Sequence, residues 1–155
     1  MKILVADPAK NITVFVLDSV ENSEKRAFLA RAILAERSLG AEQVGFVVPP
    51  KEEVPLRNPG AGRGLWRLEM AGGEFCGNAA RSFGLYVAGK QGLKGQAKIF
   101  VSVSGAAGPV EVEADVEKGW AAAEMPKPLY SFYTYDINRF HQLVVGARLS
   151  ARIRF

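Results

Sequence analysis

The sequence predicts an α+β fold in which a mixed β-sheet wraps around a central helix. Short apolar runs bounded by glycine and proline indicate strands along most of the chain. Between two groups of these strands, residues 77–88 form a predicted helix rich in small side chains, which is thin enough for a sheet to enclose it. Phe83, Leu85 and Val87 are expected to be buried. The length of 155 residues and the hydrophobic content of 48% fit a single globular domain with a sizeable core.

Two strands are expected near the N-terminus. Apolar runs at residues 2–6 and 12–17 indicate them, and a turn that contains Pro8 separates them. Asn11 is left at the start of the second strand, where its side chain can face a ligand from the strand edge. The alternative is an ordinary turn residue, because asparagine commonly caps turns.

A helix and a third strand follow. A polar N-cap begins the helix predicted over residues 22–37, and Gly40 ends it. Its apolar stripe, which is expected to cover the sheet, consists of Phe28, Leu29, Ala32, Ile33 and Leu34. Gln43 precedes the strand at residues 44–48.

The second part of the chain predicts a loop, four strands and the small-residue helix. Several prolines, glycines and charges make residues 51–64 a predicted surface loop. Residues 65–70 alternate in polarity and indicate a strand that leads to the helix at 77–88, which Gly89 is expected to end. Three further strands are expected at residues 97–103, 110–116 and 120–125.

The only cysteine stands between a glycine turn and this helix. Gly72 and Gly73 predict the turn, so Cys76 is expected at the N-cap or in the first turn. The unpaired amides of a helix N-terminus carry partial positive charge, which favours the thiolate form of a cysteine. The neighbouring N–H groups of Gly77 and Asn78 can hold a substrate carboxylate beside the sulfur.

A lone free cysteine is more often a small buried hydrophobe than a reactive group. An inert core cysteine, however, does not need Gly77 beside it, where the missing side chain lets a ligand approach the backbone. Cys76 is therefore the candidate acid/base. Glu74 adds a carboxylate near it that can favour a substrate with a distal amine, and its alternative reading is a solvated turn carboxylate.

The segment Glu-Phe-Cys-Gly-Asn-Ala-Ala-Arg-Ser at residues 74–82 resembles the Cys-Gly-Asn-Gly/Ala-x-Arg signature of the diaminopimelate epimerase family. Members of that family are cofactor-independent amino-acid racemases and epimerases that work with a pair of cysteines. Asn11 resembles the family's early Asn-Asp-Phe element, and Gln43 resembles its Gly-x-Asp-Gln element. The three elements support one ordered match from residue 1 to about residue 125.

The resemblance implies an amino-acid racemase or epimerase that needs neither a cofactor nor a metal. Cys76 would be one acid/base, Gly77 and Asn78 would donate to the substrate carboxylate, and Asn11 and Gln43 would contact the substrate. Diaminopimelate, and with it lysine biosynthesis, is the first expectation because it names the family. A phenazine-biosynthesis-type isomerase shares the fold but ranks lower, because that family lacks the cysteine motif.

A change of character after residue 128 predicts a domain boundary. Residues 1–128 are expected to form the N-terminal domain, and residues 129–155 the start of a truncated second domain or an irregular tail. His141 before an apolar run resembles the opening of the family's second domain, where Asn-Pro-His is common, although the proline is absent here. An exposed or strand-edge histidine is the alternative, since no partner for the imidazole is visible. In the family, the second cysteine lies in the second half.

Two classes of function therefore stay open. Inversion at an α-carbon requires a base on one face and an acid on the other, and the chain has one cysteine. The first class is a racemase or epimerase represented by its N-terminal half and incomplete alone. The second is a catalytically incomplete small-molecule-binding or interaction domain of the same fold. A homodimer would be another source of a second Cys76.

Composition narrows the partners and the compartment. The net charge of +4 is modest, and outside the last segment, which holds much of the arginine, basic residues lack interleaved aromatic positions, so nucleic acid is not an expected partner. No apolar run approaches the roughly 18 residues of a membrane span, and no signal peptide is expected. A single cysteine forms no internal disulfide and fits a cytoplasmic location. The expected partner is a small-molecule amino acid.

Overall fold

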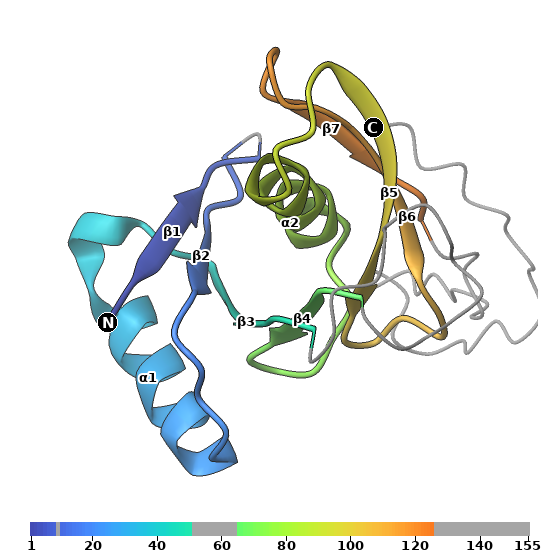
Figure 1. Cartoon of the computed structure of the whole chain (residues 1–155). Coiled ribbons are helices and arrows are strands. Elements are labelled where there is room, and N and C mark those ends of the chain that lie inside the picture. The colour runs from blue at the N-terminus through green and yellow to red at the C-terminus, as the bar shows by residue number, and fades with distance from the viewer. Residues whose placement is uncertain (9, 51–64, 126–155) are drawn as a thin grey trace, which may run out of the picture. The chain divides into compact units, whose positions relative to one another are not determined.

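In the residues that the computed structural model describes, 1–8, 10–50 and 65–125, seven strands form one mixed sheet with two α-helices packed against it (Figure 1). The strands are β1 (Ile3–Ala6), β2 (Thr13–Val16), β3 (Gln43–Val48), β4 (Arg67–Met70), β5 (Gln96–Val103), β6 (Val110–Asp115) and β7 (Trp120–Ala123). The helices are α1 (Ser23–Ala35) and α2 (Gly77–Lys90), and a short 3-10 helix, η1, spans Arg37–Leu39. The predicted α+β class with a mixed sheet is confirmed.

The strands lie in the sheet in their chain order, from β1 to β7. Two neighbouring pairs are parallel, β2 with β3 and β4 with β5, and the other pairs are antiparallel. Parallel neighbours need a long crossover connection, and α1 and α2 supply the two crossovers. Because β2 and β4 run in opposite directions, right-handed crossovers place the two helices on opposite faces of the sheet.

The side chains of β2 and β3 show the two faces. Val14 and Val44 pack in the cluster on the α1 face, whereas Phe15 and Val47 pack in the larger cluster that contains α2. Neighbouring residues of a strand point to opposite faces, so each apolar strand serves both clusters. The ring of Phe15 meets that of Phe83 edge to face, with 6.1 Å between the centroids.

Helix α2 lies very close to the sheet. Its buried residues are Ala79, Ala80, Phe83, Gly84, Val87 and Ala88. A Cβ atom added to Gly84 would lie 2.4 Å from Cγ1 of Val112 on β6, so no other residue fits there without a shift. The absence of a side chain at Gly84 therefore lets the helix approach β6.

The opposite side of α2 is not covered by strands in the described residues. Arg81, Ser82, Leu85 and Tyr86 line an open pocket of about 780 Å³, together with residues of β1 and of the start of β7. Leu85 is therefore half-buried, and the prediction that it is buried is wrong. The mixed sheet is confirmed, and the enclosure of α2 as a central helix is not.

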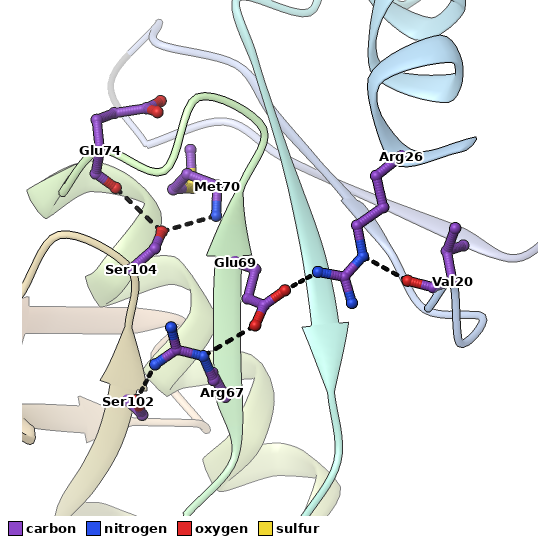
Figure 2. A network of polar contacts seen from close by, with 8 residues as sticks. All are labelled: Val20, Arg26, Arg67, Glu69, Met70, Glu74, Ser102 and Ser104. Carbon is purple, nitrogen blue, oxygen red and sulfur yellow. Dashed lines mark hydrogen bonds and ion pairs between the residues drawn. The ribbon is translucent and has the colours of Figure 1, made fainter. Parts of the chain in front are cut away.

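Helix α1 covers the other face along a narrow line. Ala30 and Ile33 are buried, but Phe28 is 63% exposed and Leu34 is 43% exposed. Ala32 is exposed as well, so the predicted apolar stripe is wrong at three positions. A polar contact replaces part of the expected apolar one: the guanidinium of Arg26 pairs with Glu69 on β4 (Figure 2).

Both helix ends differ slightly from the prediction. Helix α1 ends at Ala35 and is followed by η1, after which Gly40 adopts a left-handed conformation with φ of 58°. Helix α2 continues through Gly89 to Lys90, and the chain turns at Gly92, whose φ is 67°. A glycine with ordinary helical torsions does not by itself stop a helix.

Several expectations fall on parts of the chain outside the described residues. These are the loop at residues 51–64 and the second-domain segment at 129–155, so the boundary at residue 128 stays a prediction. Among the described helices, none combines the length and the apolar character that crossing a membrane requires.

Two glycine-to-alanine substitutions in α2 should have opposite effects on stability. Gly84→Ala should lower the free energy of unfolding by about 1–3 kcal/mol, because the added methyl group collides with buried Val112. Gly89→Ala should raise it by up to about 1 kcal/mol, because its Cβ would meet Val116 at an ordinary 3.7 Å and alanine favours the helix. Urea unfolding of both variants measures the difference, and equal effects would contradict the close packing of α2.

Candidate functional site

The structure places Cys76 at the N-cap of α2. Its backbone is extended, with φ of −128° and ψ of 117°, and its Sγ accepts a hydrogen bond from the N–H of Ala79 at 3.5 Å. The Cys76 carbonyl accepts from the N–H of Ala80 at 2.9 Å. The side chain is half-buried. The thiol therefore lies at the positive end of the helix and keeps some access to solvent.

The thiol contacts the side chain of Gln43, at the start of β3. Cys76 donates its S–H to Oε1 of Gln43, with 3.0 Å between sulfur and oxygen. The hydroxyl of Thr13, which is fully buried, lies 3.4 Å from the same oxygen and 3.5 Å from the carbonyl of Asn11. The orientation of the Gln43 amide is thus linked to both the thiol and the β2 strand.

A second chain of hydrogen bonds runs beside the first. Asn78, in the first turn of α2, donates from Nδ2 to Oδ1 of Asn11 at 3.2 Å. Asn11 in turn donates from its own Nδ2 to Oε2 of Glu42 at 2.9 Å. These contacts fix the amide of Asn11 so that its oxygen faces α2 and its nitrogen faces Glu42, directly before β3.

The parallel pairing of β2 and β3 brings these side chains to one place. Thr13 is the partner of Gln43 in the ladder, so the two strands begin side by side. The structure therefore brings together four of the residues singled out from the sequence, Asn11, Gln43, Cys76 and Asn78, all of them half-buried. Their roles in binding or catalysis stay predictions.

The first amides of α2 are the groups that a ligand can use. The amides at the start of a helix lack partners within the helix, and those of Ala79 and Ala80 are taken by Cys76. The N–H groups of Gly77 and Asn78 precede them. A Cβ at Gly77 would lie 2.5 Å from Sδ of Met125, which is half-exposed, so the glycine also makes room for this methionine.

The two less specific site candidates from the sequence are Glu74 and His141. Glu74 is exposed. A Cβ added to Gly72 would lie 2.4 Å from Oε2 of Glu74, so the glutamate carboxylate folds back over the glycine turn. This position agrees with a solvated turn carboxylate. His141 lies outside the described residues.

Sequence reasoning did not assign roles to two polar residues of the site. Thr13 and Glu42 contact Gln43 and Asn11. Their only signal in the sequence is their position near the two candidates, because the contacts depend on the strand register.

Within the described residues, no three or more His, Cys, Asp or Glu side chains are grouped so that they could hold a metal ion.

The sequence is similar to one family of enzyme domains. The model of the family described as the histidine racemase CntK N-terminal domain matches residues 1–142. The chain belongs to this family. A histidine racemase from Fusobacterium nucleatum subsp. nucleatum is 33% identical over 127 residues, which cover 78% of this chain and 42% of the relative. A histidine racemase from another strain of this subspecies is 38% identical over 78 residues, 50% of this chain and 23% of the relative.

The histidine racemase family supports the broader expectation from the sequence, an amino-acid racemase family. It does not single out diaminopimelate epimerase, which the motif resembles, and it says nothing of lysine biosynthesis. The chain spans less than half the length of the curated relatives it matches.

Substitutions at the N-cap should separate a functional thiol from a buried apolar one. Cys76→Ser should be at least as stable as the wild type, because serine is a preferred N-cap residue, and Cys76→Ala should be less stable than Cys76→Ser by about 0.5–2 kcal/mol. Urea unfolding of the three proteins gives the order. If serine is the least stable of the three, the thiol contributes chiefly as a buried hydrophobe.

Proposed function

We propose that the chain forms one side of a cofactor-independent amino-acid racemase site, in which the thiolate of Cys76 removes or returns the α-proton of the substrate. The observation that carries this proposal is the position of Sγ at the N-cap of α2, 3.0 Å from Gln43 and beside the Asn11–Asn78 pair. A group that exchanges protons must be held in place and remain reachable, and these contacts support both requirements.

The start of α2 would bind the substrate carboxylate. The N–H groups of Gly77 and Asn78 lie at the positive end of a 14-residue helix, where an anion is stabilised. Removal of the α-proton moves negative charge onto the carboxylate, so donors aimed at its oxygens stabilise the carbanion more than the ground state. Each such donor is worth about 2.7–4 kcal/mol in comparable sites.

Gln43 would serve both protonation states of the thiol. Its Oε1 accepts the S–H of Cys76, and after the proton leaves, the amide can turn so that its NH₂ group donates to the thiolate. Thr13 can follow this rotation, because a hydroxyl donates or accepts, and it lies within 3.4 Å of the amide oxygen. The pair would keep the sulfur hydrogen-bonded throughout the reaction.

Inversion needs a second acid/base on the other face of the α-carbon, and the chain contains one cysteine. We therefore place Cys76 on one face only and assign the other face to a group outside the described residues. A homodimer that brings two Cys76 sites together is a second source. A cytoplasmic location would keep the single thiol reduced.

Histidine is the substrate we propose, since both curated relatives are named histidine racemases. Diaminopimelate is the substrate implied by the motif alone, and the cysteine mechanism is part of the same resemblance. The competing function is a catalytically incomplete domain that binds an amino acid or a protein partner, and the single cysteine is the observation that favours it.

The protein should exchange the α-proton of histidine with solvent. In D₂O, the Cα–H signal of L-histidine should fade in proton NMR spectra when the 155-residue chain is added. Cys76→Ser should slow the exchange by about 10²-fold or more, because the general base is lost while the cap is kept. Diaminopimelate, assayed in parallel, tests the alternative substrate.

Chiral analysis of the same samples shows how the second face is served. Exchange with retained configuration fits a single acid/base on this chain, and racemisation that grows with the square of the protein concentration fits a homodimeric site. No exchange with either amino acid, combined with measurable binding of histidine, would favour the binding domain instead.

A further inference from the structure

The hydroxyl of Ser104, directly after β5, joins the two ends of the glycine turn that precedes Cys76. Ser104 Oγ accepts a hydrogen bond from the N–H of Met70 at 2.8 Å and donates to the carbonyl of Glu74 at 3.1 Å. Figure 2 shows this oxygen between the end of β4 and the turn. Ser104 is 8% exposed. One buried hydroxyl thus bridges the segment from Met70 to Glu74, two residues before the N-cap.

The contact replaces a step of the backbone ladder between β4 and β5. The N–H of Ser104 donates to the carbonyl of Leu68 at 2.9 Å, as in a regular parallel pair. The next N–H on β4, that of Met70, bonds to the serine hydroxyl instead of a backbone carbonyl, because the chain turns away at Gly105, whose φ is 73°. The side chain therefore extends the ladder where the backbone cannot.

The neighbouring residue holds the same turn by direct contact. A Cβ at Gly105 would lie 2.3 Å from the backbone nitrogen of Phe75 and 2.7 Å from the carbonyl carbon of Glu74. These are backbone atoms, which cannot move aside as a flexible side chain can. Ser104 and Gly105 together fix the peptide between Glu74 and Phe75, and Cys76 is the next residue.

We propose that Ser104 is a positioning residue for Cys76: by tying the turn to β5, its hydroxyl sets the sulfur in line with the first amides of α2. The consequence for catalysis rests on the proposed function, in which the thiolate must be ready beside the carboxylate site. The alignment itself concerns only the protein and can be measured without substrate.

A purely structural role would be to satisfy two buried polar groups. Ser102, near the end of β5, offers a matched control that separates this structural role from positioning. Ser102 accepts a hydrogen bond from Arg67 at 2.8 Å (Figure 2), so its removal also breaks a β4–β5 contact, but one at the start of β4, away from the turn. Loss of positioning should follow from Ser104→Ala and not from Ser102→Ala.

The test is the pH profile of iodoacetamide labelling at Cys76, the only cysteine of the chain. The plateau of the profile reports access of the reagent, and its midpoint reports how well the surroundings stabilise the thiolate. Ser104→Ala should slow labelling near neutral pH by up to about tenfold and leave the high-pH plateau unchanged, because the sulfur is no longer aligned with the first amides of α2. The carboxylates of Glu42 and Glu74 are unchanged in every variant.

Wild type, Ser102→Ala and Ser104→Thr should share one labelling rate near neutral pH, since threonine keeps the hydroxyl. Ser104→Val, which has the shape of threonine without the hydroxyl, should behave as Ser104→Ala and replaces it if the alanine protein does not fold. An unchanged labelling rate near neutral pH in Ser104→Ala, or an equal change in Ser102→Ala, would each overturn the proposal. Failure of histidine exchange would leave this result as it stands.

Discussion

The close packing of α2 on β6 is the constraint on which the rest of the described structure depends. Gly84 faces Val112 with no space for a side chain, since an added Cβ would lie 2.4 Å from Cγ1 of the valine. Alanines continue the same buried face of the helix. A tightly packed core resists displacement, so this contact fixes the body of α2, and the turn tied to β5 by Ser104 leads into its N-terminus.

The parallel pairing of β2 and β3 explains why residues distant in the sequence meet at that N-terminus. Thr13 pairs with Gln43, and the backbone amides of Glu42 and Gln43 both donate to the carbonyl of Ile12. Helix α1 makes this register possible, because a crossover returns the chain to the same edge of the sheet. Asn11 and Gln43 are therefore held next to α2 by the sheet, and the same edge collects the amide side chains that the proposed reaction requires.

Local patterns predicted the elements because each strand has its own apolar run and each helix its own cap. The main site residues could be named because a contiguous motif surrounds Cys76. Ser104 could not be named in the same way, because its two partners, Met70 and Glu74, lie 34 and 30 residues away in the sequence. A serine after a strand is also an ordinary turn residue. The exposure of Phe28 was missed for a related reason: the angle at which α1 crosses the sheet decides which of its apolar residues are covered.

Several residues at the site are not the ones that the stability of the fold alone would favour. A serine or aspartate would cap α2 better than Cys76, whose sulfur accepts the Ala79 amide at a long 3.5 Å. Gly77 weakens the first turn of the helix. The amides of Asn11 and Asn78 hydrogen-bond to each other in a half-buried place where apolar side chains would serve the core. Such departures from local rules are expected where function constrains a sequence. Here they gather at one end of one helix, which supports the role proposed for the thiol.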